Sequence, residues 1–98
     1  MPRAGNSLKY TIFAIVKGIP KGMTASYAEI AKRAGAPGAH RYVATLMSQN
    51  YDSAVPCHRV IYSSGKIGNY NRGGEDKKIQ LLKKEGVIIK DNYVHLKN

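Results

Sequence analysis

The run Pro-Cys-His-Arg-Val contains Cys57, the only cysteine of the chain. A free cysteine titrates near roughly 8.5, and neighbouring positive charge or a histidine base favours the thiolate. His58 and Arg59 follow Cys57 directly, so an imidazole and a guanidinium stand beside the thiol. This arrangement predicts a nucleophilic cysteine. The Gly-Asn-Tyr run at 68–70 and the Glu-Gly pair at 85–86 could supply a third catalytic group.

The charge balance of the chain indicates a polyanionic partner. Among 98 residues, 16 are Lys or Arg and 6 are Asp or Glu, which gives a formal net charge of +10. An excess of this size in a short chain favours nucleic acid as the partner, although solubility alone or a ribosomal extension would also account for it. We interpret the lysines as a diffuse attraction to phosphate, including Lys21, Lys32, Lys77 and Lys78.

Length and composition predict one small domain covering residues 1–98. A single cysteine excludes an internal disulfide framework and a zinc ribbon that needs several cysteine ligands. No apolar run approaches the ~20 residues of a membrane span, and the first residues lack the apolar core of a signal peptide. We therefore expect a soluble intracellular protein with no membrane partner, cytoplasmic (and associated with the nucleoid) or, in a eukaryote, nuclear.

The elements that must position these residues begin with three short helices. Apolar residues recur at helical spacing from Leu8 to Ile19, and Pro20 should end this first helix. Ser26 and Glu29 form a capping box for a second helix that ends at Gly35. After a Pro-Gly turn, a third helix is predicted over 39–48. Two short helices joined by such a turn are typical of a helix-turn-helix.

The third helix has two different faces. Its apolar side consists of Ala39, Val43, Leu46 and Met47. Its opposite side consists of Arg41, Ala44, Thr45 and Ser48. Small exposed side chains would let this helix approach a nucleic acid closely, while a plain helical hairpin remains the alternative interpretation.

The second half of the chain predicts a helix and a hairpin. A helix is expected over 75–85, with Ile79 and Leu82 facing inward and Gly86 as the residue after its C-cap. The apolar runs at 87–89 and 93–96 flank a polar turn at 90–92, a pattern typical of a β-hairpin. The predicted fold class is therefore mainly α with a small amount of β. Its architecture is a winged helix-turn-helix DNA-binding domain with a C-terminal β-hairpin.

Taken in order, these stretches resemble the DNA-binding and catalytic domain of the O6-alkylguanine-DNA alkyltransferases. The matching residues are 19–22, Ser26, Tyr27, Arg41, Val43, Asn50, 56–61, 68–70, Leu81, Leu82, Glu85 and Gly86. The family transfers an alkyl group from guanine in DNA to its own cysteine, once and irreversibly. The resemblance implies double-stranded DNA containing O6-alkylguanine as the partner, a monomer, and no metal or organic cofactor, since the cysteine itself is the acceptor.

The resemblance also implies the catalytic roles. Cys57 would be the nucleophile, and a soft thiolate suits displacement at the alkyl carbon. His58 would take the thiol proton through an ordered water, and Glu85 would hold the imidazole in the right tautomer. The Tyr70 hydroxyl would protonate the leaving guanine. Asn50 belongs to the same expected catalytic set.

A base inside a duplex cannot reach a buried thiol, so the nucleotide must be flipped out. The resemblance assigns Arg41 as the finger that fills the gap in the base stack. It assigns Tyr27 as the residue that presses on the phosphate of the flipped nucleotide. The remaining expected DNA-binding residues are Ala44, Thr45, Ser48, Ser63 and Arg59.

The chain also departs from typical members of the family. We expect that the usual N-terminal domain is absent. The loop between Asn50 and Cys57 is shorter, and Arg72 looks like an insertion. These features resemble the alkyltransferase-like proteins, which bind alkylated DNA without repairing it and have lost the cysteine. Because Cys57 is present, we favour a single-turnover enzyme. A lesion-recognition protein and a winged-helix regulator with an incidental cysteine remain the alternatives.

Overall fold

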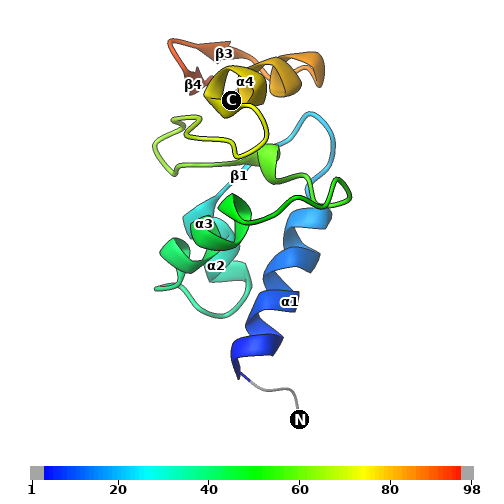
Figure 1. Ribbon diagram of the computed structural model, residues 1–98. Helices are drawn as coiled ribbons and strands as arrows, with labels where there is room; N and C mark the ends of the chain where they lie inside the picture. The colour runs from blue at the N-terminus through cyan, green and yellow to red at the C-terminus, as the bar shows by residue number, and fades with distance from the viewer. Residues whose placement is uncertain (1–3, 96–98) are drawn as a thin grey trace.

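The computed structural model describes residues 4–95, with side chains from Leu8 onward. Figure 1 shows a lower half built from α1, α2 and α3 and an upper half built from α4 and a hairpin. The elements are α1 (Ala4–Lys17), β1 (Ala25–Ser26), α2 (Tyr27–Arg33), α3 (His40–Ser48), the 3₁₀ helix η1 (Cys57–Arg59), β2 (Val60–Ile61), α4 (Gly74–Lys84), β3 (Ile89–Lys90) and β4 (Tyr93–Val94). The predicted fold class, mainly α with a small amount of β, is confirmed. Among the described residues, no helix is long and apolar enough to cross a membrane.

The lower half is packed around side chains from all three helices. Ile12 and Val16 of α1, Ile30 of α2 and Val43 of α3 are completely buried. The first helix ends at Lys17, earlier than the predicted Ile19, because Gly18 closes it with bonds to the carbonyls of Ala14 and Ile15. Helices α2 and α3 form the predicted helix-turn-helix.

The cap of α2 is half of the predicted capping box. The Ser26 hydroxyl accepts a hydrogen bond from the backbone N–H of Glu29 at 3.0 Å, as expected for an N-cap. The Glu29 carboxylate instead pairs with Arg33, one turn further along the helix. Gly35 ends the helix with a φ of +80°, a conformation that favours glycine.

A short parallel strand pair that the sequence did not predict joins the two halves. Ala25 pairs with Val60, and Ser26 pairs with Ile61. Strands of two residues are too short to show an alternating pattern, so no sequence signal marks them. The pairing brings the start of α2 beside the strand that directly follows η1, and thereby places Tyr27 near Cys57.

The upper half has a second, smaller core made by Ile61, Ile67, Leu82 and Val87. Helix α4 ends at Lys84, and Gly86 follows its C-cap with a φ of +93°, as predicted. In the hairpin, Ile89 pairs with Val94 and Lys90 pairs with Tyr93.

The turn of this hairpin is shorter than the three-residue turn predicted at 90–92. Asp91 and Asn92 both have positive φ, at 53° and 65°, which is the backbone of a two-residue hairpin turn. Lys90 therefore belongs to β3. Leu96, which was expected in the second strand, lies outside the described residues.

Candidate active site

A cavity of about 290 Å³ opens between the two halves, and Cys57 lines it. Residues from α2, α3, η1 and the segment before α4 surround it. The lining residues are Tyr27, Ala44, Thr45, Met47, Ser48, Cys57, Tyr62, Asn69, Tyr70, Asn71 and Lys78. The volume is near the lower end of sites that hold small molecules, which range from roughly 300 to 1,000 Å³.

The thiol lies at the start of η1 and is buried, with only 4% of Cys57 exposed. A backbone hydrogen bond from Cys57 to the carbonyl of Val55, at 2.8 Å, tightens the chain just before the helix. The sulfur accepts a hydrogen bond from Nη2 of Arg72 at 3.7 Å. The cysteine is therefore held in place and touches a positive charge.

Asn50 organises the loop that leads to the cysteine. Its amide nitrogen donates to the carbonyls of Asp52 and Val55, both at 3.3 Å, and its amide oxygen accepts from the N–H of Asp52 at 3.1 Å. Asn50 is also buried. In this structure it positions the loop before Cys57, and all of these contacts are made to backbone atoms.

His58, Glu85 and Arg59 form one half-buried polar cluster, and His58 directly follows Cys57 in the chain. Nε2 of His58 lies 2.9 Å from Oε2 of Glu85. Arg59 binds both oxygens of the same carboxylate, with Nε at 2.9 Å from Oε1 and Nη2 at 2.8 Å from Oε2. The Arg59 hydrogen bond, assisted by His58, lowers the pKa of Glu85 to about 2 against a smaller opposing effect of burial.

The charge of Glu85 fixes the tautomer of His58. An ionised carboxylate can only accept, so Nε2 of His58 must carry the hydrogen in their contact. The other ring nitrogen, Nδ1, then has a free lone pair in neutral His58. This is the tautomer in which Nδ1 can accept a proton.

Arg59 is among the expected DNA-binding residues, and in the structure its half-buried guanidinium contacts other parts of the protein. Besides Glu85, it donates from Nη1 to the carbonyl of Ile19 at 3.0 Å. The hydrogen bond to Glu85 raises the pKa of Arg59 above its ordinary value. Arg59 thus connects Ile19, in the segment after α1, to Glu85, the C-cap of α4.

The phenols of Tyr27 and Tyr70 are both kept protonated by their surroundings. Burial, with smaller contributions from Tyr62 and Cys57, raises the pKa of Tyr27 to about 12. Burial is also the main reason that the pKa of Tyr70 is raised. Both hydroxyls line the cavity as neutral groups near pH 7 and can donate a hydrogen bond there.

Tyr62, which the sequence did not single out, packs against Tyr27 with the two rings tilted by 59° and 5.2 Å between their centroids. Its ring lies over Gly68, where an added Cβ would come within 2.6 Å of it. Gly68 also has a φ of +80°, so glycine is required there for two reasons. The Gly-Asn-Tyr run is therefore needed both for its tyrosine and for the space that its glycine leaves.

Our interpretation of the lysines as a diffuse attraction to phosphate is wrong for Lys78, because this residue is not at the surface. Its side chain is completely buried in the wall of the cavity. Nζ donates to the carbonyl of Asn69 at 3.3 Å and lies 5.8 Å from the centre of the Tyr27 ring. Burial lowers the pKa of Lys78 to about 8, while Cys57 acts in the opposite direction.

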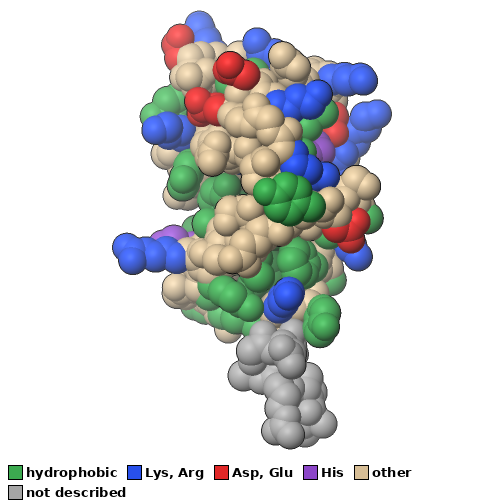
Figure 2. All heavy atoms as spheres, viewed as in Figure 1, with side chains coloured by type: hydrophobic (Ala, Val, Ile, Leu, Met, Phe, Trp, Pro, Cys, Tyr) green, Lys and Arg blue, Asp and Glu red, His purple; other side chains and the backbone are tan. Residues whose placement is uncertain are grey.

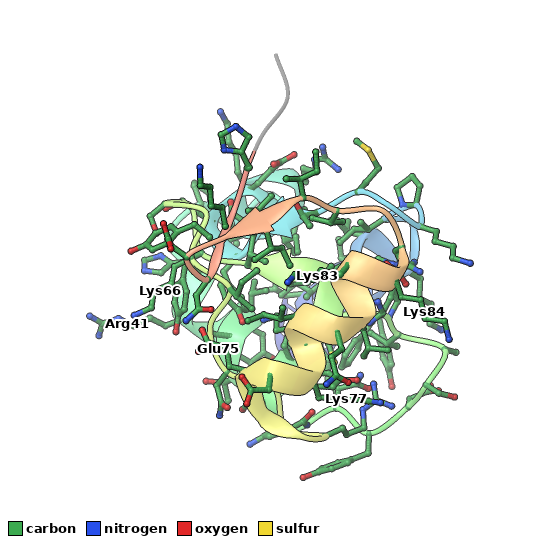
Figure 3. The ribbon with its side chains drawn as sticks, turned by 90° about the horizontal axis from the view of Figure 1, so that it is seen from above. Arg41, Lys66, Glu75, Lys77, Lys83 and Lys84 are labelled. Carbon is green, nitrogen blue, oxygen red and sulfur yellow. The ribbon has the colours of Figure 1, made fainter. Side chains whose placement is uncertain are left out.

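The outer face of α3 carries the expected DNA-binding residues. Arg41, Thr45 and Ser48 are exposed and Ala44 is half-buried, and Figure 3 shows Arg41 extending away from the body of the molecule. The Thr45 and Ser48 hydroxyls donate to the helix carbonyls of Arg41 and Thr45, at 3.0 and 2.7 Å.

A second hollow of about 520 Å³ adjoins the cysteine cavity. Both are lined by Tyr27, Ala44 and Tyr62. The second hollow also includes Arg41 and Ser63. The two cavities therefore connect the exposed arginine of α3 to the buried thiol. Most of the expected site residues, from Tyr27 to Tyr70, line this path.

The basic side chains are distributed over both halves of the molecule. Figure 2 shows Lys and Arg around the edges of one face, with Asp and Glu between them, rather than a single continuous patch. A spread of this kind attracts a polyanion over a wide area and leaves precise positioning to other contacts.

The comparisons with known proteins agree on one protein family. Residues 7–87 match the family model described as 6-O-methylguanine DNA methyltransferase, DNA binding domain. The methylated-DNA–protein-cysteine methyltransferase of Methanothermobacter thermautotrophicus is 43% identical over 79 residues, covering 80% of this chain and 43% of that protein. The enzyme of the same name from Cricetulus griseus is 40% identical over 80 residues, covering 81% of this chain and 38% of that protein. The chain thus spans less than half the length of these relatives.

Two solved structures have the same fold. Atl1 of S. pombe, in complex with damaged DNA containing O6-carboxymethylguanine, superposes with a TM-score of 0.78 at 32% identity, covering 92% of this chain and 83% of that one. OGT of Mycobacterium tuberculosis, in complex with DNA, gives a TM-score of 0.75 at 39% identity, covering 88% of this chain and 51% of that one. Both relatives were solved bound to DNA.

Proposed function

The chain belongs to the family of the 6-O-methylguanine DNA methyltransferase DNA-binding domain, and we propose that it is itself a single-use alkyltransferase. It would take an alkyl group from O6 of guanine in double-stranded DNA onto Cys57. The observation that carries this proposal is the setting of Cys57: a buried thiol that faces a base-sized cavity and contacts a guanidinium. A cysteine that served only the core would need neither the cavity nor the charge.

The reaction starts with recognition of the lesion. Helix α3 lies against the duplex, Arg41 takes the place of the flipped nucleotide, and Tyr27 donates its hydroxyl to the nearby phosphate. The flipped base enters the cavity between Tyr27, Tyr62 and Tyr70. Aromatic rings suit this task because stacking on them compensates for the stacking that the base loses in the duplex.

Transfer is one displacement with a balanced proton count. The thiol of Cys57 loses its proton through a water to Nδ1 of His58, whose orientation Glu85 maintains. The sulfur electron pair forms a bond to the alkyl carbon while the carbon–O6 bond breaks, leaving its electrons on guanine. The neutral hydroxyl of Tyr70 donates a proton to the departing base. Tyr70 then regains a proton from solvent, and His58 releases the thiol proton to solvent. The thioether is stable, so each molecule acts once.

The second candidate is a lesion-binding protein that does not transfer the group. Its support is the likeness to Atl1, of which this chain covers 83%, whereas it covers only part of the methyltransferase relatives. In this case the cavity would hold the damaged base, and Cys57 would line it without reacting.

Intact-protein mass spectrometry with a duplex that contains one O6-methylguanine separates the two candidates. We expect a stoichiometric gain of one methyl group that peptide fragmentation places on Cys57. Cys57→Ser should show no gain and should keep lesion-selective binding in a mobility-shift assay. An unmodified wild-type protein that still binds the lesion selectively would favour the second candidate.

A further inference from the structure

Arg72 points inward from the turn before α4, although its sequence position gives no hint of this. Its Nη2 lies 3.7 Å from Sγ of Cys57, and its guanidinium carbon lies 5.6 Å from the centre of the Tyr70 ring. Its Nε is buried and has no hydrogen-bond partner among the described residues. The guanidinium therefore lies against Cys57 and Tyr70.

The turn that carries Arg72 is fastened on both sides. The neighbouring Asn71 donates from its side chain to the carbonyls of Ser48 and Asn50, at 2.7 and 2.8 Å. On the other side, the N–H of Gly74 bonds to the carbonyl of Tyr70 at 2.7 Å. These contacts fix the backbone of Arg72 relative to the end of α3 and the start of α4. The long side chain thus starts from a fixed point beside the thiol.

The sulfur is the group best placed to balance the charge of Arg72. Within residues 8–95, no carboxylate forms an ion pair with Arg72, and Glu85 is already engaged by Arg59 and His58. The titratable groups of the other packed elements near Cys57 are Tyr27 of α2, Tyr62 after β2, Tyr70 before α4, His58 of η1 and Lys78 of α4. Glu75 of α4 acts on Lys78. Both tyrosines with shifted pKa values stay neutral near pH 7. The Lys78 ammonium also interacts with Cys57 through its charge, but its hydrogen bond goes to the carbonyl of Asn69.

We propose that Arg72 is a further catalytic residue, whose guanidinium donates directly to Sγ of Cys57 and stabilises the thiolate before DNA binds. This role rests on the proposed function, because the thiolate is the nucleophile of the transfer. The hydrogen bond to Cys57 also raises the pKa of Arg72 above its ordinary value, so Arg72 keeps its proton throughout. Arg72 supplies charge, and His58 removes the proton.

A thiolate stabilised in this way should react with a small electrophile even without DNA. Iodoacetamide tests this directly: the sulfur displaces iodide, and the protein gains one carbamidomethyl group. The rate follows the fraction of Cys57 that is ionised, so its pH profile reports the effect of Arg72 apart from DNA binding and base flipping.

The test compares Arg72→Met, Arg72→Gln and Arg72→Lys with Lys84→Met, an exposed α4 residue that makes the same change in net charge as Arg72→Met. We expect the iodoacetamide rate near neutral pH to fall by about tenfold in the Met and Gln variants, because the thiolate loses the charge that stabilises it. Arg72→Lys should recover part of the loss, and Lys84→Met should match the wild type. The Gln variant keeps a polar side chain in the turn in case Met disturbs folding.

Two results would overturn the proposal. One is an iodoacetamide profile and a DNA affinity that are both unchanged in the Met and Gln variants. The other is an unchanged iodoacetamide profile with weaker DNA binding, which would make Arg72 a phosphate contact. The proposed function can fail separately. A wild type that reacts with iodoacetamide in an Arg72-dependent way but takes no methyl group from DNA would keep Arg72 as the thiolate partner and reject the alkyltransferase.

Discussion

At the scale of the residue, one carboxylate determines the state of its neighbours. Glu85 orients His58 through Oε2 and holds Arg59 with both oxygens. The same atoms therefore contact both the residue proposed to take the thiol proton and a residue that links two parts of the fold. A change at Glu85 should affect both, and the two effects can be measured separately.

Glu85→Gln should slow methyl transfer by about tenfold to a hundredfold, because the amide no longer requires the hydrogen to be on Nε2 of His58. It should also change the response to acid. The depressed pKa of about 2 means that Glu85 stabilises the folded state above the usual carboxyl range and that this stability is lost as the pH falls toward 2.

Thermal unfolding from about pH 7 down to about pH 3 measures the second effect. The wild type should lose more stability over this interval than Glu85→Gln. Glu29→Gln is a matched control, because Glu29 is a more exposed carboxylate that pairs with Arg33 on the surface. Equal acid sensitivity of the wild type and Glu85→Gln would contradict the assigned role.

At the scale of the element, the two sides of α3 differ in their surroundings. Its inner side is fixed in the core by Val43, Leu46 and Met47, while Arg41 extends from its outer side. Helix α3 contributes to the cavity wall but supplies none of the groups expected to react. Changes on its outer face should therefore affect access of a base to the cavity and leave the thiol unchanged.

Arg41→Ala should slow transfer from duplex DNA by tenfold or more, since unstacking a base costs a few kcal/mol and ~1.4 kcal/mol corresponds to a factor of ten. The rate with a free O6-alkylguanine base should remain that of the wild type. Single-turnover kinetics with both substrates measure this contrast. Lys17→Ala, an exposed position at the end of α1, controls for the lost charge; an equal loss with both substrates would contradict a role in base flipping.

At the scale of the whole molecule, a buried ammonium lowers the stability of the fold. Lys78 is completely buried, and its pKa falls to about 8 mainly because burial disfavours the charged form. The unfolded chain binds this proton up to about pH 10.4. Between about pH 8 and about pH 10.4 the unfolded state binds more protons than the folded state, so the free energy of unfolding of the wild type should rise with pH. Below about pH 8 the buried ammonium lowers this free energy by its full amount.

Lys78→Met should therefore raise the unfolding temperature at neutral pH, with ~1 kcal/mol corresponding to about 4–8 °C in a domain of this size. The gap between variant and wild type should narrow as the pH approaches about 9.5. Calorimetry at both pH values checks this, with the exposed Lys77→Met as the control. A less stable Lys78→Met protein at neutral pH would mean that the contacts with Asn69 and Tyr27 outweigh the cost of burial.

Local signals in the sequence predicted much of this structure. The Ser26 cap, the glycine after α4 and the hairpin each depend on a few neighbouring residues. Pairing of Ala25 with Val60 is different, because two-residue strands far apart in sequence leave no pattern. This pairing is what brings Tyr27 beside the cysteine cavity.

The lysines show where residue type alone misleads. Lys78 lies four positions before Leu82, so the two share a face of α4, and Leu82 is buried. The spacing therefore predicted that Lys78 faces the core, whereas its charge favoured an exposed side chain. Arg72 had no comparable signal, because its direction depends on the contacts of Asn71 with the end of α3.

The aromatic lining of the cavity also makes the protein its own optical probe. The chain has seven tyrosines and no tryptophan, and Tyr27, Tyr62 and Tyr70 all line the cavity. Tyrosine emission is therefore not masked by indole, and a purine stacked among these rings should quench a substantial part of it. Entry of a damaged base could thus be followed in real time on unlabelled protein, before and independently of any covalent change.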